Sequence, residues 1–354
     1  MTEKTVTKAK RSGCVVWILR IIGGGALLLV VLLLAGYAYQ AKTTNDDFRQ
    51  FPAPGELVDV GGYNLHIYCT GEGSPTVVVD AGNGDFSLGW SLVQPEVAGF
   101  TRICTYDRAG YGWSDSGPQP RSAEQIANEL HTLLSNAGIE GPYVLVGHSM
   151  GGYDVRMYAH LFPNDVVGMV LVDAGHEEQF SRLPPEYERI SQQQVSTLSV
   201  MGFMSRFGIL RVMGDSSGGQ DLAPAMTRLL PSNVQGLYLT MMSHPAYFDA
   251  TLAELNALPE SNVQVGLLGD LGDLPLYVLT AGNSIDAAAL ESIGLAADFD
   301  VSQLQRTWLE LQDELAALST NSTHTIAENS PHGIHIYYPD LVIDAIRQVV
   351  EMIR

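Results

Sequence analysis

Hydrophobic and polar positions divide this chain of 354 residues into regions with three different patterns. Residues 21–39 form an apolar run without a charge. From residue 55 to residue 174, and again from residue 274, strand-like runs alternate with amphipathic stretches. Between these two parts, about a hundred residues are helix-like throughout. The pattern predicts a membrane-length segment followed by an α/β domain with a helical insertion.

The alternating part begins at residues 55–73, which alternate around a Gly-Gly turn and predict an antiparallel hairpin. Residues 75–82 then form a nearly continuous apolar run, as is typical of a buried parallel strand. Further strands are expected at 101–110, 143–147, 166–174, 274–282 and 322–330. Helical patterns lie at 90–99, 122–138, 150–162, 301–319 and 339–354, and Ser122 with Gln125 predicts a capping box. We therefore predict a doubly wound, mostly parallel sheet of eight strands.

The helix-like insertion covers residues 177–272, so the predicted core consists of residues 55–176 and 273–354. The insertion holds six of the eleven methionines, namely Met201, Met204, Met213, Met226, Met241 and Met242. Methionine fills irregular spaces and adapts to varied shapes, which favours a lid over an apolar pocket. Packing within the insertion would account for many of these methionines equally well.

The N-terminal pattern predicts a membrane anchor. At about 1.5 Å per residue, the uncharged run 21–39 nearly crosses a hydrocarbon core of ~30 Å, and the apolar stretch from Cys14 extends it. Basic residues precede the run and almost none follow it closely. This asymmetry predicts a basic cytoplasmic tail at 1–13, a transmembrane signal-anchor at 14–40 and a linker at 41–54, with the rest exported to the extracellular or periplasmic side.

A cleaved secretory signal is the alternative, because Gly36-Tyr37-Ala38 offers small residues at suitable positions. The apolar regions of such signals usually span about 7–15 residues, which is shorter than this run. We favour the uncleaved anchor. In both cases most of the chain is exported.

Charge and cysteine content narrow the function classes. The formal net charge is −20, spread through the patterned segments, and such a surface repels nucleic acid and anionic bilayers. We therefore expect no nucleic-acid partner. Three cysteines, one of them Cys14 in the predicted span, are too few for a disulfide framework or a cysteine-based zinc site.

A serine stands among glycines where a predicted strand meets a predicted helix. Gly147-His148-Ser149-Met150-Gly151 matches the pattern G-x-S-x-G. In a strand-to-helix elbow the central residue is held at strained backbone angles, and glycines two positions away leave room for the tight turn. Ser149 is our predicted nucleophile. The backbone N–H of Met150, at the start of the helix, could stabilise an oxyanion.

The candidate base is His332, which lies between the last predicted strand and the closing helix. His335 is its nearest competitor, and we interpret it as a surface or packing histidine. His148 adjoins the serine but points away from the hydroxyl in an elbow, so we assign it a structural role. His176 and His244 could line the pocket, although a lone histidine more often packs or faces solvent.

Three motifs in this order resemble the α/β-hydrolase superfamily over roughly residues 55–354. They are "GHSMGG" (147–152), "YDRAGYGWSD" (106–115) and "SPHGIHIYYPDLVIDAI" (330–346). The resemblance implies that the insertion is the cap, and that Asp107, Arg108, Gly110, Gly112 and Trp113 brace the floor of the site. It also implies a second oxyanion N–H after the third strand, where this chain has Ala81-Gly82 in place of the usual His-Gly. Asn83 is our candidate for that donor, with Gly84 next.

The position of the acidic residue of the triad departs from the usual pattern of the superfamily. The usual place in the superfamily is the loop after the seventh strand, with the pattern G-x-x-D, but this chain has Ile285 at that spacing and Asp286 one residue later. Some members take the acid from the end of the sixth strand, where this chain offers Asp173. We favour Asp173 and keep Asp286 as the alternative. Cys69 and Cys104 fall in the second and fourth strands, which neighbour each other in this fold, and are either disulfide-bonded or two buried thiols.

The resemblance implies a serine hydrolase that cleaves an ester-type bond of a small, apolar acyl substrate through an acyl-enzyme. Serine at the elbow argues against epoxide hydrolysis and dehalogenation, which use an aspartate in this fold. We expect no cofactor, no metal and no obligate protein partner. Two alternatives remain: an acyltransferase with the same triad, and a membrane-tethered, non-catalytic binding protein with a hydrolase fold.

Overall fold

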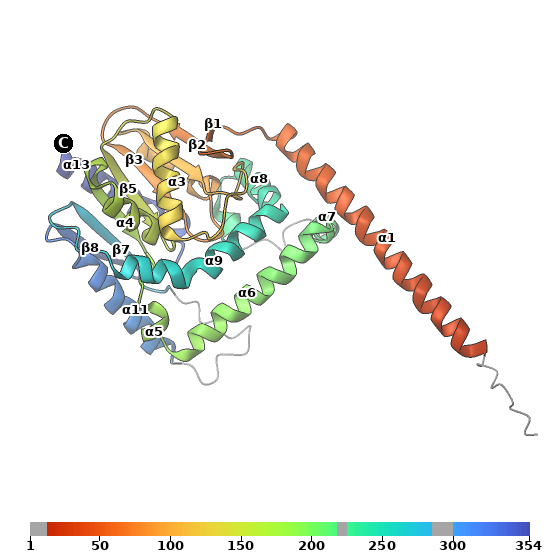
Figure 1. The fold of residues 1–354 in the computed structure, drawn as a ribbon. Helices are drawn as coiled ribbons and strands as arrows, with labels where there is room; N and C mark the ends of the chain where they lie inside the picture. Colours follow the sequence, from red (N-terminus) through yellow and green to blue (C-terminus); the bar gives the residue numbers. More distant parts are fainter. Residues whose placement is uncertain (1–12, 218–224, 285–299) are drawn as a thin grey trace, which may run out of the picture.

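The computed structural model describes residues 13–217, 225–284 and 300–354, and their eight strands form one sheet in the order β1-β2-β4-β3-β5-β6-β7-β8 (Figure 1). The strands are β1 (Glu56–Asp59), β2 (Asn64–Thr70), β3 (Thr76–Asp80), β4 (Ile103–Asp107), β5 (Tyr143–His148), β6 (Val166–Val172), β7 (Leu276–Ala281) and β8 (Ser322–Ala327). β1 and β2 form the predicted hairpin, β2 runs antiparallel to β4, and the other pairs are parallel. The predicted fold class is confirmed.

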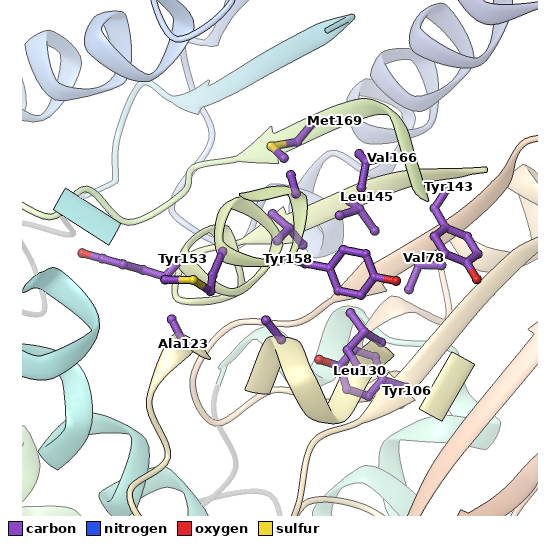
Figure 2. Packing of buried hydrophobic residues seen from close by; sticks show 14 of the residues in the cluster. Val78, Tyr106, Ala123, Leu130, Tyr143, Leu145, Tyr153, Tyr158, Val166 and Met169 are labelled. Atoms are coloured by element: carbon purple, nitrogen blue, oxygen red, sulfur yellow. The ribbon is translucent and has the colours of Figure 1, made fainter. Parts of the chain in front are cut away.

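Helices cover both faces of the sheet, because successive side chains of the central strands point to opposite sides. In β5, Leu145 packs on one face with α3 (Ala123–Asn136) and α4 (Gly151–Leu161). Figure 2 shows this packing, with Leu130 of α3 and Tyr153 and Tyr158 of α4 around the strands. α11 (Val301–Ala316) lies on the same face.

The neighbouring positions of β5, Val144 and Val146, pack on the other face with α2 (Gln94–Val97) and α13 (Pro339–Ile353). Both faces are therefore buried, which explains the continuous apolar runs of the parallel strands.

The start of α3 differs from the predicted capping box. Ser122 is the N-cap residue but its side chain makes no capping hydrogen bond. Instead, the N–H of Ala123 donates to Ser261 Oγ (3.0 Å) and the N–H of Glu124 donates to Gln264 Oε1 (3.1 Å). Both acceptors lie on α9 (Pro245–Gly266) of the insertion. A tertiary contact thus satisfies the free N–H groups that the local motif would have satisfied.

The insertion between β6 and β7 is helical, as the pattern indicated. Its described elements are α5 (Gln179–Arg182), α6 (Pro185–Arg206), α7 (Ile209–Ser217), η3 (Ala225–Leu229), α8 (Ser232–Met242) and α9. An aromatic cluster joins this cap to the loops that follow β3 and β4. The rings of Phe86 and Tyr238 stack with centroids 4.7 Å apart, and the Tyr111 ring meets the Tyr247 ring at 5.8 Å. The cap is therefore packed onto the carboxyl edge of the sheet, where the parallel strands end.

α1 (Gly13–Gln50) is a single helix of 38 residues that projects from the domain (Figure 1). Its most apolar part has a mean hydropathy of 2.6 and none of it is buried in the protein, so it is long and apolar enough to cross a membrane. The predicted linker at 41–54 is wrong as far as Gln50, because the helix continues to that residue. A pair between Lys42 and Asp46, one turn apart, supports this extension.

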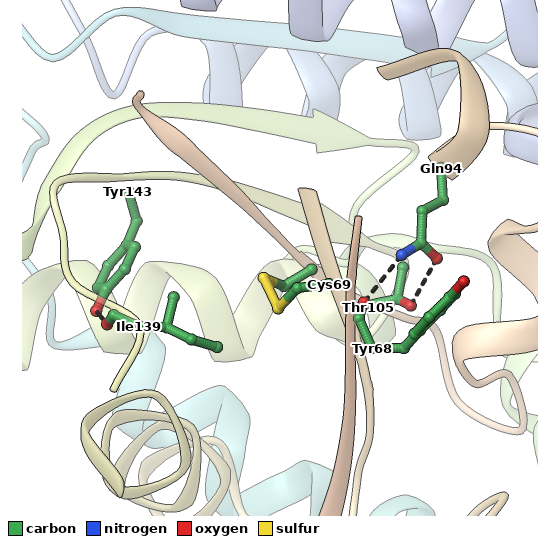
Figure 3. The surroundings of a disulfide bond; sticks show 7 residues. Tyr68, Cys69, Gln94, Thr105, Ile139 and Tyr143 are labelled. Atoms are coloured by element: carbon green, nitrogen blue, oxygen red, sulfur yellow. Dashed lines mark hydrogen bonds between the residues drawn. A yellow bond between two sulfur atoms is a disulfide. The ribbon is translucent and has the colours of Figure 1, made fainter. Parts of the chain in front are cut away.

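The two sulfurs of Cys69 and Cys104 form a disulfide between β2 and β4, where the two residues stand directly opposite each other. Figure 3 shows the bond between the strands, with Gln94 of α2 nearby. The Gln94 side chain donates to the Tyr68 carbonyl and accepts from Thr105 Oγ1, each at 2.9 Å. Of the two states left open for these cysteines, the disulfide is the one observed.

Candidate active site

The turn between β5 and α4 holds Ser149 at a φ of +52°, in the left-handed region that a side chain rarely adopts. The Ser149 N–H donates to the Val172 carbonyl (3.2 Å), and the Ser149 carbonyl accepts from the Gly175 N–H (2.8 Å). A Cβ on Gly147 would lie 2.6 Å from the Gly151 carbonyl oxygen, and one on Gly151 would lie 2.3 Å from the Asp80 carbonyl oxygen. The flanking glycines are therefore required by close backbone approach, as predicted.

Asp173 and His332, although 159 residues apart, are joined by a hydrogen bond of 2.6 Å between Oδ2 and Nδ1. Asp173 directly follows β6, has a φ of +40° and is fully buried. A carboxylate only accepts, so the His332 ring carries a proton on Nδ1, and in the neutral ring Nε2 is left free to take another. This is the geometry of an acid–base pair.

Three further donors hold the Asp173 carboxylate. Oδ1 accepts from the Ala281 N–H (2.9 Å) and from Trp308 Nε1 (2.8 Å), while Oδ2 also accepts from Ser284 Oγ (2.8 Å). Trp308 lies on α11 and Ser284 follows β7. Four hydrogen bonds in all compensate for the burial of this group. The alternative acid, Asp286, lies outside the described residues.

His332 lies next to the elbow. Its carbonyl accepts from His148 Nε2 at 3.1 Å, and the two imidazole centroids are 4.7 Å apart. His148 directly precedes Ser149, and the side chain of His332 is 42% exposed. Within the described ranges, Ser149 Oγ and the His332 ring share no hydrogen bond of 3.5 Å or less. In enzymes such contacts often tighten only when substrate binds.

His335 takes no part in the pair with Asp173. It is buried, stacks on the Trp90 ring (centroids 4.6 Å apart) and bonds Asp85 Oδ2 through Nε2 at 3.2 Å. It packs 4.5 Å from the His148 ring, and burial together with the neighbouring His335 and His332 lowers the pKa of His148 well below its usual range. His148 and His335 are thus both packing residues. This agrees with the structural role predicted for His148 and with one of the two roles, surface or packing, considered for His335.

Asp85, His148 and His335 bring one potential metal-ligand atom each to within 4.8 Å of one another. The Asp85 carboxylate already bonds His335 and accepts from the Tyr238 hydroxyl (3.1 Å). His148 packs against the His335 ring and donates to the His332 carbonyl, so we interpret the three as a buried packing group next to the elbow.

The loop after β3 reaches the elbow at Gly82. A Cβ on Gly82 would lie 3.1 Å from the Ser149 Cβ, so the next residue, Asn83, begins beside Ser149. The Asn83 side chain is held by the cap: Nδ2 donates to the Thr251 carbonyl (3.1 Å) and to Glu254 Oε2 (3.0 Å). Met150 stands at the first turn of α4. Both predicted oxyanion residues therefore adjoin Ser149, one along the chain and one across the sheet edge.

A buried ionic network underlies this loop. Arg108, after β4, bonds Glu254 of α9 through Nε (2.7 Å) and Nη2 (2.9 Å), and bonds Asp80 through Nη1 (2.6 Å). Arg108 Nη2 also donates to the Gly82 carbonyl (2.9 Å). Burial opposes the charge of Arg108, but Glu254 and Asp80 together raise its pKa well above normal. The motif around Arg108 thus braces the loop, as the resemblance implied.

Three residues of this site were not identified from the sequence: Ser284, Trp308 and Glu254. Trp308 lies in the helical pattern predicted at 301–319, and its indole N–H was the available signal for a buried acceptor. Ser284 stands two residues before Asp286, the alternative acid. Glu254 belongs to the cap, and its pairing with Arg108 spans 146 residues, which no local pattern reveals.

Comparison with known proteins identifies the family. Residues 77–345 match the model of the alpha/beta hydrolase family, so the chain belongs to that family. Its relatives include a probable transporter, efuK, of Hormonema carpetanum (34% identical, 42% of this chain and 23% of that protein). Another is a protein of Schizosaccharomyces pombe, which is 26% identical over 80% of this chain and 53% of that protein. The chain therefore spans about half or less of the length of both proteins. It covers 85% of the YqjL protein of Bacillus subtilis, at 27% identity over 79% of this chain.

Solved structures share the fold. A thermophilic esterase of Thermogutta terrifontis matches 84% of this chain and 97% of its own, with a TM-score of 0.57 and 20% identity. The haloalkane dehalogenase DatA of Agrobacterium tumefaciens matches 85% of this chain and 98% of its own, with a TM-score of 0.61 and 17% identity. At such identities the likeness establishes the fold alone, and one fold hosts many reactions.

Proposed function

We propose that this protein is a membrane-anchored serine hydrolase that cleaves an ester-type bond of a small, apolar acyl substrate. Ser149 is the nucleophile, His332 the base and Asp173 the acid. The observation that supports this assignment most directly is the 2.6 Å bond between Asp173 and His332, beside an elbow that holds Ser149 at positive φ.

The proposed reaction begins when Ser149 Oγ attacks the ester carbonyl carbon and His332 Nε2 takes its proton. The backbone N–H groups of Met150 and Asn83 stabilise the negative oxygen of the tetrahedral intermediate. The leaving alcohol takes the proton from His332, and an acyl-enzyme remains. Water then attacks that acyl group with the same proton relay, releasing the acid and restoring Ser149. Asp173 holds the imidazole and stabilises its positive charge.

The elbow distinguishes this proposal from the reaction named for the dehalogenase that shares the fold. A serine at position 149 forms an acyl-enzyme, whereas an aspartate at an elbow would form an alkyl ester with its substrate. An ester panel of graded acyl length would identify the preferred substrate, and a preference for longer acyl groups would support an apolar pocket.

We also propose that α1 remains attached as an anchor, with the catalytic domain exported. Contacts of α1 with the cap support retention: Asp47 bonds His244 (3.0 Å) and pairs with Arg211. The Cys69–Cys104 disulfide supports export, since such bonds persist in oxidising compartments. The intact mass of the purified protein tests the proposal, because cleavage after Ala38 would remove residues 1–38.

The nucleophile is tested by labelling with a fluorophosphonate probe. We expect the wild type and the control variant Ser135→Ala, altered at an exposed serine of α3, to label equally. Ser149→Ala should not label although it folds. Equal labelling of Ser149→Ala would contradict the proposal. An unlabelled wild type that binds apolar ligands would instead identify a non-catalytic binding protein.

A further inference from the structure

The cap exposes a group of apolar side chains where α6 meets α7. Val200 and Phe203 of α6 are 57% and 53% exposed, and Val212 of α7 is 58% exposed. Ile209 and Met213 of α7 are also exposed. Spacings of three and four residues place the members of each helix on one side of it. We name these five residues the apolar corner of the cap.

This apolar corner adjoins the apolar helix α1. A Cβ on Gly36 of α1 would lie only 2.4 Å from the Phe207 carbonyl oxygen, and a Cβ on Gly208 would lie 2.7 Å from the Tyr39 ring. Arg211 Nε donates to Gln40 Oε1 at 3.1 Å. Figure 1 shows α7 beside α1 at the side of the domain from which α1 projects. The contacts fall at the end of the uncharged run, where a spanning helix leaves the hydrocarbon.

The side chains around the contact have the character of a membrane interface. Tyr37 and Tyr39 of α1 are both exposed, and tyrosines are enriched at the level of lipid headgroups. The sequence from Ile190 to Ser205 contains no charged residue, in a chain of which 16% is charged. The next two arginines are paired, Arg206 with Asp249 and Arg211 with Asp47. Insertion of this corner would therefore desolvate no unpaired arginine of this stretch.

We infer that the apolar corner of the cap inserts into the headgroup and outer acyl region of the bilayer that α1 spans. This inference rests on the proposed anchor. Continuity with α1 selects the occupant, because a helix that spans the membrane holds the corner at the lipid surface without any further partner. The cap that covers the site is thereby seated on the membrane, and a lipophilic ester dissolved in the bilayer reaches it without crossing bulk water. Such surfaces insert to a depth of ~5–10 Å.

Depth-dependent quenching tests the inference on the full chain in phosphatidylcholine vesicles. On a Cys14→Ser background, a bimane fluorophore is attached to Phe203→Cys or Val212→Cys, and lipids carry a nitroxide near the headgroup. The matched control is Val263→Cys on α9, which is 65% exposed and next to Gln264, a partner of the start of α3. We expect about twofold or greater quenching at positions 203 and 212, and little at 263.

A third position separates the two proposals. Leu28→Cys lies within the apolar run of α1 and should be quenched by nitroxides deeper in the acyl chains. Quenching at position 28 with none at 203 and 212 would overturn the inference and leave the anchor standing. No quenching at position 28 would overturn both. Fluorophosphonate labelling of the same vesicles reports separately on Ser149.

Discussion

At the scale of single residues, the site depends on how one buried carboxylate is held. Asp173 accepts from an imidazole, an indole, a hydroxyl and a backbone N–H, which come from three segments of the chain. These bonds leave the carboxylate one productive orientation toward His332. The Asp173 carboxylate keeps the proton of the His332 ring on Nδ1. Loss of this carboxylate should therefore lower kcat more than it raises KM.

Asp173→Asn should therefore lower kcat by about 10³–10⁴, because an amide can donate to Nδ1 and select the wrong tautomer. Asp286→Asn is the matched variant and should keep nearly full activity. The measurement is kcat and KM for a chromogenic short-chain ester, with circular dichroism to confirm folding. Full activity of Asp173→Asn together with loss in Asp286→Asn would transfer the role to Asp286.

At the scale of elements, α9 of the cap contributes to the floor of the site as well as to its cover. Glu254 receives bonds from Arg108, from the Tyr111 hydroxyl (2.9 Å) and from Asn83. The proposed oxyanion residue is thus fixed by the cap. The capping of α3 by Ser261 and Gln264 strengthens the same connection between α9 and the core.

Glu254→Gln should lower the free energy of unfolding by about 3 kcal/mol, because it leaves Arg108 buried with one carboxylate partner fewer. Glu260→Gln, on the same helix but exposed, should change it by less than about 0.5 kcal/mol. Urea denaturation followed by fluorescence measures both. Equal midpoints for the two variants would show that the network contributes nothing to stability.

At the scale of the whole molecule, the full chain carries a formal net charge of −20. A few specific bonds hold the domain to its anchor and to its cap and join the strands of its sheet. The disulfide joins the antiparallel edge strand β2 to β4, so it secures the hairpin to the parallel sheet. Burial next to the elbow lowers the pKa of His148 well below its usual range, which favours its neutral form.

Removal of the disulfide, in Cys69→Ser/Cys104→Ser, should cost about 3–4 kcal/mol, because the bond closes a loop with a sequence separation of 35. Cys14→Ser is the control and should leave the stability unchanged. Thermal unfolding in detergent, with and without a reductant, measures the effect. The prediction would be contradicted if the reductant reached the disulfide and the wild type still unfolded at the same temperature.

Acidification should destabilise the protein through His148. Burial lowers the pKa of this imidazole in the folded state, so below about pH 6.5 the unfolded chain binds a proton that the folded chain resists. Stability present above pH 6.5 is then lost as the pH falls, by on the order of 1 kcal/mol between pH 7.5 and 5.5. His148→Asn should lose less over the same range in urea titrations. The same slope in both proteins would exclude His148 as the cause.

Local patterns along the chain determined the strands, the elbow and the identity of His332 as a candidate. Apolar runs, glycine spacing and chain order depend on neighbours in sequence, so the sequence alone contains them. The tertiary structure decided the rest: the disulfide, the helical course of residues 41–50, the capping of α3 and the partner of His332. Contacts between distant segments decide the disulfide, the capping of α3 and the partner of His332, and residues 41–50 also meet the cap where Asp47 pairs with Arg211. Local periodicity does not encode which distant side chains meet, because that depends on how the elements pack.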